Sequence, residues 1–201
     1  GSGIRIDAGA NSNLIGGNQI GYFDDMGTIV ALGNPSDGVR FDVTGMGNRV
    51  IGAAFAHNVN GIYLNGHPFS HQQNTTVRDS SIYSSVEHGI VLSGTIGSLI
   101  EWVALEGNGR DGLSERASGN NFWLPYWVRG NGGLGIDRDA TNDALDQPST
   151  HPAYLMPVIT DYDRQTGLVT GYDPSYTFNT SIEIHLYGVV NAERDPSGYG
   201  E

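Results

Sequence analysis

The fold is indicated by the phrase Gly61-Ile62-Tyr63-Leu64, in which a glycine is followed by an apolar, a variable and an apolar residue. The phrase occurs four times in clear form, and the other copies are Gly3-Ile4-Arg5-Ile6, Gly38-Val39-Arg40-Phe41 and Gly89-Ile90-Val91-Leu92. Weaker copies begin at Gly112 and Gly135. The intervals between the six glycines are 35, 23, 28, 23 and 23 residues, which indicates a repeat with insertions in two units.

Three further columns run in phase with this phrase. Two are apolar, and they consist of Val50, Val77, Ile100 and Trp123, and of Phe55, Ile82, Leu105 and Val128. The third is polar and consists of Asn58, Ser85, Asn108 and Asn131. All three keep spacings of 27, 23 and 23 residues, so they predict stacked units with short strands facing a common core. We expect the polar column to hydrogen-bond along its own stack at a turn.

Composition narrows the function classes. The 201 residues include 30 glycines, no cysteine and no lysine, and ten arginines stand against 22 acidic residues for a net charge of −12. Disulfides and thiolate metal sites are therefore excluded. A nucleic-acid partner is not expected, because such binding requires clustered basic residues. No apolar run is long enough for a membrane span.

These features predict an all-β chain with a right-handed parallel β-helix of about six coils over residues 1–139. A leucine-rich repeat has a similar period, but its leucine and asparagine framework is missing here. Insertions are expected at 22–37 and 65–74. A linker loop is expected at 140–152, and residues 153–201 are expected to form a small antiparallel β module, with strands at 155–160, 166–172 and 180–187.

Some phrases also carry a family resemblance. They are Arg129-Gly-Asn-Gly-Gly-Leu-Gly-Ile-Asp137, Pro157-Val-Ile-Thr160 and Asp195-Pro-Ser-Gly-Tyr-Gly-Glu201. With the repeat, they resemble the right-handed parallel β-helix repeat proteins, and more closely the large secreted or surface bacterial proteins of that class. The resemblance implies an extracellular or cell-surface location and a C-terminal module that is the start of a β-sandwich.

Polar side chains on the outer face of the first strand of each coil are the first candidate site. In similar β-helix lyases and hydrolases this face acts on acidic polysaccharides, where a cation neutralises the uronate and a base removes a proton. The candidate catalytic residues on this reading are Arg5, Asp7, Arg40, Asp42, Tyr63 and His67. The alternative is that the charged residues form cross-strand pairs without a ligand. No polygalacturonase phrase is intact.

Two other groups are candidates for binding. Tyr126 and Trp127 are expected to face outward and to stack on a sugar ring, whereas Trp123 lies in an inward column and is expected to fill the core. An oxygen-rich loop is a candidate for Ca²⁺, with Asp137, Asp139, Asn142, Asp143 and Asp146 as ligands. The alternative for this loop is a solvated turn with Asx capping.

The sequence thus leads to two expectations for function. The first is a non-catalytic extracellular structural or adhesion module, which binds an extracellular glycan or self-associates through the β-helix ends and the C-terminal sheet. The alternative is a polysaccharide lyase or epimerase that acts on an acidic glycan at the outer β-helix face.

Overall fold

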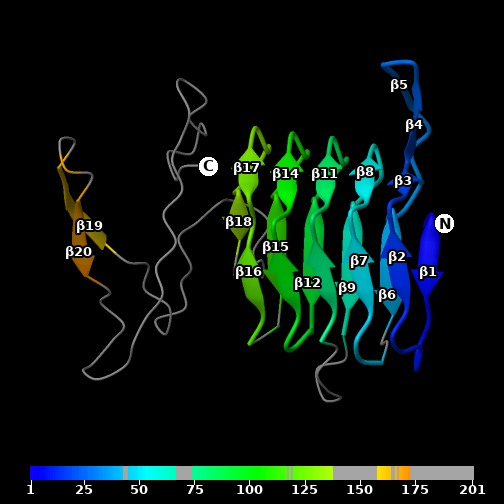
Figure 1. Ribbon diagram of the computed structural model, residues 1–201, viewed down its shortest axis with the longest axis horizontal. Helices are drawn as coiled ribbons and strands as arrows, with labels where there is room; N and C mark the ends of the chain where they lie inside the picture. Colours follow the sequence, from blue (N-terminus) through cyan, green and yellow to red (C-terminus); the bar gives the residue numbers. More distant parts are fainter. Residues whose placement is uncertain are drawn as a thin grey trace. The chain divides into compact units, whose positions relative to one another are not determined.

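The structure is a computed structural model that describes residues 1–42, 45–66, 74–116, 118, 120–137, 158–163, 166 and 168–172. Every regular element among them is a β-strand (Figure 1). The chain divides into two compact units, Gly1–Asp146 with Tyr187–Glu201, and Gln147–Leu186. The larger unit contains a stack of coils, and the smaller one contains an antiparallel pair of strands.

The stacked coils form three parallel sheets. The first sheet has six strands, in the order β1 (Ile4–Ile6), β6 (Val39–Asp42), β9 (Ile62–Asn65), β12 (Ile90–Ser93), β15 (Leu113–Arg116) and β18 (Ile136–Asp137). The second has five, namely β2 (Leu14–Gly16), β7 (Arg49–Ile51), β10 (Thr76–Arg78), β13 (Leu99–Glu101) and β16 (Phe122–Leu124). The third also has five, namely β3 (Gln19–Ile20), β8 (Ala54–Ala56), β11 (Ser81–Tyr83), β14 (Ala104–Glu106) and β17 (Trp127–Arg129).

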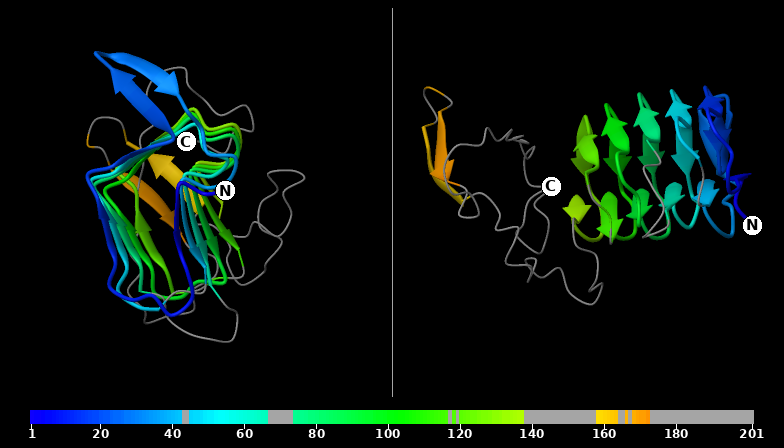
Figure 2. Two further views of the ribbon diagram at one scale, coloured as in Figure 1. Left: turned by 90° about the vertical axis from the view of Figure 1, so that its right-hand side faces the viewer. Right: turned by 90° about the horizontal axis from the view of Figure 1, so that it is seen from below.

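Viewed along the stack, the strands of successive coils superpose (Figure 2, left). This arrangement confirms the predicted parallel β-helix. The expected number of about six coils is slightly too high, because two of the three sheets have only five strands.

The strand register follows the sequence columns. Val77 pairs with both Val50 and Ile100, and Ile82 pairs with both Phe55 and Leu105. These six residues are fully buried, as are the apolar residues of the glycine phrases from Val39 to Leu113. The core is therefore a continuous apolar column inside the coils. Trp123 packs against this core, as predicted, and its indole N–H donates to the buried carboxylate of Glu115.

The polar column also behaves as predicted. Asn58, Asn108 and Asn131 are buried, and Asn108 Nδ2 donates to Asn131 Oδ1 at 2.8 Å. Asn108 Oδ1 in turn accepts a hydrogen bond from the backbone N–H of Ser85 at 3.1 Å. Because a buried backbone N–H needs a partner, these amides stabilise the corner where each coil turns back.

The glycines that begin the repeat phrases, here called the coil-entry glycines, are required by a close approach between backbones. At Gly38, Gly89 and Gly112 the backbone is not left-handed. Instead, a Cβ at Gly89 would lie 2.5 Å from the carbonyl oxygen of Gly112 in the next coil. Glycine is required there because adjacent backbones approach closely, not because φ is positive.

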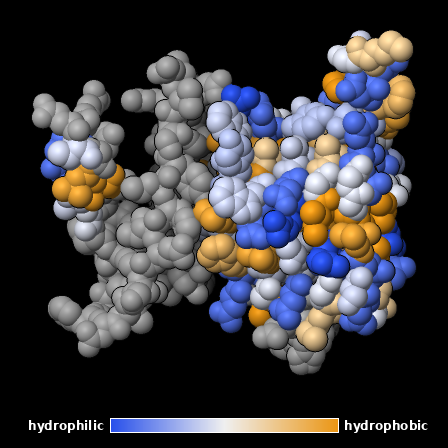
Figure 3. All heavy atoms as spheres, viewed as in Figure 1, coloured by the Kyte–Doolittle hydropathy of each residue, from blue (hydrophilic) through white to orange (hydrophobic). Residues whose placement is uncertain are grey.

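The predicted insertion at 22–37 is an antiparallel hairpin. Its strands are β4 (Tyr22–Asp25) and β5 (Thr28–Ala31), and it projects from the side of the first coil (Figure 2, left). Hydrophobic side chains are visible on its surface, and Phe23 is 54% exposed (Figure 3). The predicted excursion at 65–74 and the predicted linker at 140–152 lie mostly or wholly outside the described residues.

In the smaller unit, β19 (Val158–Tyr162) and β20 (Val169–Tyr172) form an antiparallel pair with an irregularity between Ile159 and Asp161. They match two of the three strands predicted for this region. The third, at 180–187, lies outside the described residues.

Candidate functional site

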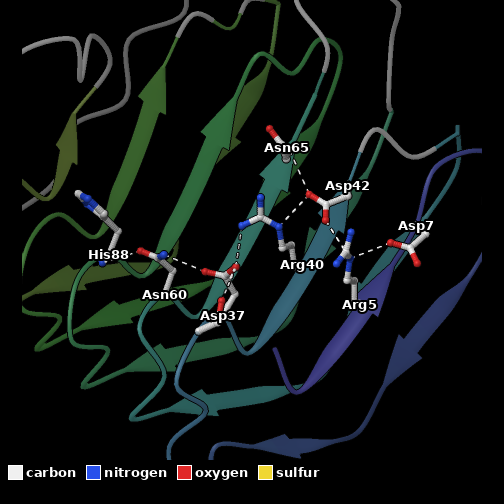
Figure 4. Close-up of polar contacts among 9 residues, drawn as sticks. Arg5, Asp7, Asp37, Arg40, Asp42, Asn60, Asn65 and His88 are labelled. Carbon is white, nitrogen blue, oxygen red and sulfur yellow. Dashed lines mark hydrogen bonds and ion pairs between the residues drawn. The ribbon is translucent and has the colours of Figure 1, made fainter. Parts of the chain in front are cut away.

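The outer face of the first sheet brings most of the predicted catalytic residues together. Arg5 is in register with Arg40, and Arg40 is in register with Tyr63, so the three side chains occupy neighbouring outward positions. Asp42 and Asp7 lie beside them, from β6 and from the end of β1 (Figure 4). His67 lies outside the described residues. The structure therefore places five of the six candidate residues next to one another.

Asp42 is the centre of this cluster. Its Oδ1 accepts hydrogen bonds from Arg40 Nε at 2.8 Å and from Asn65 Nδ2 at 3.1 Å. Its Oδ2 lies 3.0 Å from Arg5 Nε, which is also 2.7 Å from Asp7 Oδ1. Both oxygens of the carboxylate are therefore engaged by cationic or amide donors of the protein (Figure 4).

Arg40 is held from three sides. In addition to Asp42, its Nη1 lies 3.1 Å from the buried Asp37 Oδ2, and its guanidinium stacks 4.5 Å from the centre of the Tyr63 ring. Such a contact with an aromatic face is favourable for a cation. The guanidinium is thus fixed in one orientation by protein groups.

The electrostatic surroundings keep both groups ionised. Burial opposes the charge on Asp42, but hydrogen bonds from Asn65 and Arg40 and the charges of Arg40 and Arg5 outweigh it and lower the pKa of Asp42. Burial likewise opposes the charge on Arg40, but hydrogen bonds to Asp42 and Asp37 and their charges raise its pKa. A general base works best with a pKa near the operating pH, so Asp42 is shifted in the unfavourable direction for that role.

The network continues into a buried ladder that the sequence reasoning missed. Asn60 donates to Asp37 Oδ1 at 2.8 Å and accepts from the backbone N–H of His88 at 3.2 Å (Figure 4). His88 Nδ1 lies 3.0 Å from Asp111 Oδ2, and Arg116 Nη2 lies 2.9 Å from His88 Nε2. A signal for the ladder was present, because Asp37, Asn60, His88 and Asp111 each directly precede a coil-entry glycine.

The ladder is a structural feature of the coil stack. Asp37, Asn60, His88 and Asp111 are all buried, and Asp111 Oδ1 accepts the backbone N–H of Leu134 at 2.9 Å. Each polar side chain thus binds the next coil, as buried polar groups must to offset desolvation.

The predicted aromatic binding residues lie at a corner between the second and third sheets. Tyr126 is 65% exposed, and its ring centre lies 6.4 Å from that of the partly buried Trp127, with only 30° between the planes. Arg129, which pairs with Glu106, lies over the Trp127 ring at 4.7 Å. The outward orientation predicted for Tyr126 is confirmed.

Trp102 lies at the same corner. The sequence did not predict that its side chain would be exposed. It is 53% exposed, and its backbone N–H donates to the carbonyl of Leu124, which places it beside the corner of the next coil. Its φ of 53° lies in the left-handed region, which is a rare state for a bulky side chain. Its column neighbours at this corner, Gly17, Gly52 and Asp79, could have revealed this geometry.

The calcium loop is mostly outside the described residues. Asp137 ends β18 and is in register with Ser114, whereas Asp139, Asn142, Asp143 and Asp146 are not described. Over the described ranges, no group of three or more His, Cys, Asp or Glu side chains is placed to hold a metal ion.

The fold defines the class of this protein, which is an all-β protein built on a parallel β-helix. No family model matches the chain, and neither the curated proteins nor the solved structures give a match. In the part of the chain that the structure describes, no helix is long and apolar enough to cross a membrane.

Proposed function

We propose that this chain is a non-catalytic extracellular module of structural or adhesive function, in which the β-helix acts as a rigid scaffold. The observation that carries the proposal is that protein groups bind both oxygens of the Asp42 carboxylate and keep it ionised. Its two oxygens bind Arg5, Arg40 and Asn65, and its pKa is lowered. A carboxylate held in this way contributes to cross-strand stability and is poorly suited to remove a proton from a substrate.

The alternative is a lyase or epimerase on an acidic glycan. It is favoured by one observation, namely that Arg5, Arg40 and Tyr63 are neighbours on an outer face. Against it, each arginine is already neutralised by aspartate, so a uronate would have to compete with Asp7, Asp37 and Asp42 for the cations.

Incubation with alginate and pectate in the presence of Ca²⁺ distinguishes the two functions. The proposed function predicts no rise in ultraviolet absorbance from unsaturated products and no epimerised residues in the polymer. Turnover by the wild type that is lost in Arg40→Ala, with the circular dichroism spectrum retained, would overturn the proposal.

Self-association is the second part of the proposal. In the described residues β1, β2 and β3 each pair with one strand only, so each leaves one edge of backbone groups open. Such edges are templates for pairing with another chain. We expect concentration-dependent oligomers in sedimentation velocity and light scattering, and a strictly monomeric species at high concentration would contradict this part.

A further inference from the structure

We propose that Trp102, Tyr126 and Trp127, here called the aromatic corner, bind a neutral polysaccharide by stacking on its sugar rings. The inference rests on the proposed non-catalytic function and extends it by naming the ligand class and the site. It is independent of the outer face of the first sheet, because the aromatic corner lies between the second and third sheets.

The first observation is that the corner residue of each coil occupies an equivalent position, so these residues form a column along the stack. The column consists of Gly17, Gly52, Asp79, Trp102 and Pro125, and its first four members have φ between 51° and 64°. Glycine and aspartate accept this left-handed state far more readily than tryptophan. Trp102 therefore occupies a strained position while about half of its surface stays exposed. Core packing does not explain a strained and exposed indole, and such outliers point to a function.

The second observation concerns the next coil. Proline cannot adopt a positive φ, so Pro125 must turn the corner differently from the four residues before it in the column. The residue after the corner is buried in the three preceding coils, where it is Ala53, Ser80 or Val103, and exposed in the first coil, where it is Asn18. Tyr126 at the equivalent place is 65% exposed, although it follows a coil in which this place is buried. The backbone N–H groups of Tyr126 and Trp127 both donate to the carbonyl of Val103, which fixes this altered corner against the preceding coil.

The third observation is that the rings are oriented before any ligand binds. The Tyr126 and Trp127 rings lie beside each other with centres 6.4 Å apart and planes tilted by 30°, and Arg129 lies over the Trp127 ring at 4.7 Å. Arg129 is in turn paired with Glu106. Because the Trp127 ring is held between Tyr126 and Arg129, less conformational entropy is lost when a ligand binds there.

The chemistry of the surroundings favours a sugar over an apolar protein surface. A pyranose ring has apolar C–H faces and a rim of hydroxyl groups, and tryptophan and tyrosine have apolar faces and a polar edge. The neighbouring outward residues are polar, and they form the pairs Arg78–Asp79, Arg78–Glu101 and Arg129–Glu106. Such side chains can bond to hydroxyl groups at the edge of the rings.

Charge favours a neutral glycan over an acidic one. Three acids, Asp79, Glu101 and Glu106, surround two arginines, which are both already ion-paired. The whole chain carries −12 charges. A polyuronate or a sulfated glycan would therefore be repelled, and a neutral polysaccharide would not.

The test is affinity electrophoresis of the full chain in native gels that contain hydroxyethyl cellulose, glucomannan, laminarin or polygalacturonate. The wild type should be retarded by at least one of the three neutral polymers and not by polygalacturonate. Trp102→Asn and Tyr126→Ala should each weaken that binding at least tenfold. Phe23→Ala is the matched control, since Phe23 is an equally exposed aromatic residue on the hairpin, and it should bind like the wild type.

The thermal midpoint separates binding from folding. Asparagine tolerates the left-handed state, so Trp102→Asn should melt at or above the wild-type temperature while it loses binding. Absence of retardation by all three neutral polymers would overturn the inference, as would binding that survives both corner substitutions. Loss of self-association in Trp102→Asn without any polysaccharide binding would also overturn it, in favour of a protein partner. None of these failures affects the proposed function, which is tested separately by turnover of a polysaccharide and by the oligomeric state of the wild type.

Discussion

Replacement of Gly89 by alanine is expected to destabilise the β-helix by about 1–3 kcal/mol, the usual cost of overpacking a close contact. The added Cβ would lie 2.5 Å from the carbonyl oxygen of Gly112, 3.0 Å from Asn108 Nδ2 and 3.2 Å from Leu105 Cδ2. The carbonyl cannot move freely, because it accepts the backbone N–H of Ile90 at 2.9 Å. Separating the two coils to admit the methyl group would therefore weaken the ladder hydrogen bonds on either side.

Equilibrium unfolding in urea, followed by circular dichroism, measures the change. Gly52→Asn is the control, since Gly52 has a φ of 63° and no atom within 4 Å of its Cβ position, and asparagine tolerates that φ. The control should remain within about 0.5 kcal/mol of the wild type. An alanine variant at Gly89 that also stays within that range, with an unchanged dependence on urea, would refute the close-approach argument.

Two further predictions concern polar groups. The lowered pKa of Asp42 means that its ionised form stabilises the fold above an unfolded pKa of about 3.9, and that this contribution is lost as the pH falls through the lower folded pKa. Between pH 7 and pH 3 the urea midpoint of Asp42→Asn should consequently fall less than that of the wild type, and equal falls would contradict the network. Asn108→Ala should cost about 1–3 kcal/mol, because it leaves the buried N–H of Ser85 without its partner. The exposed Asn18→Ala is its control, and an unchanged midpoint for Asn108→Ala would show that water replaces the amide.

The register of the coils could be predicted because the repeat is nearly one-dimensional. A spacing of 23 residues places Ile100 beside Val77 and Leu105 beside Ile82 whenever each coil has the same length, and the structure has these pairs. Alternation then assigns the inward and outward faces without further information. The juxtaposition of Arg5, Arg40 and Asp42 follows from the same logic.

Contacts that depend on the third dimension could not be predicted in this way. The sequence shows that His88 precedes a glycine, but not that its ring lies between Asp111 and Arg116. Nothing in the sequence distinguishes Trp102 from the other aromatic residues. Its exposure and its left-handed φ depend on the path of the backbone at the corner. The reason why glycine begins each repeat phrase could not be predicted for a similar reason, because only the neighbouring coil shows what a Cβ would meet.

The sequence by itself therefore determined the period, the strand register and the identity of the core of this protein. These properties follow from the order of apolar residues along the chain. Only the tertiary structure decided which charges neutralise one another and which aromatic rings stay outside. Both depend on distances of a few ångströms between coils and on the backbone angles at single corners, such as those at Trp102 and Pro125, and a repeat pattern does not contain that information.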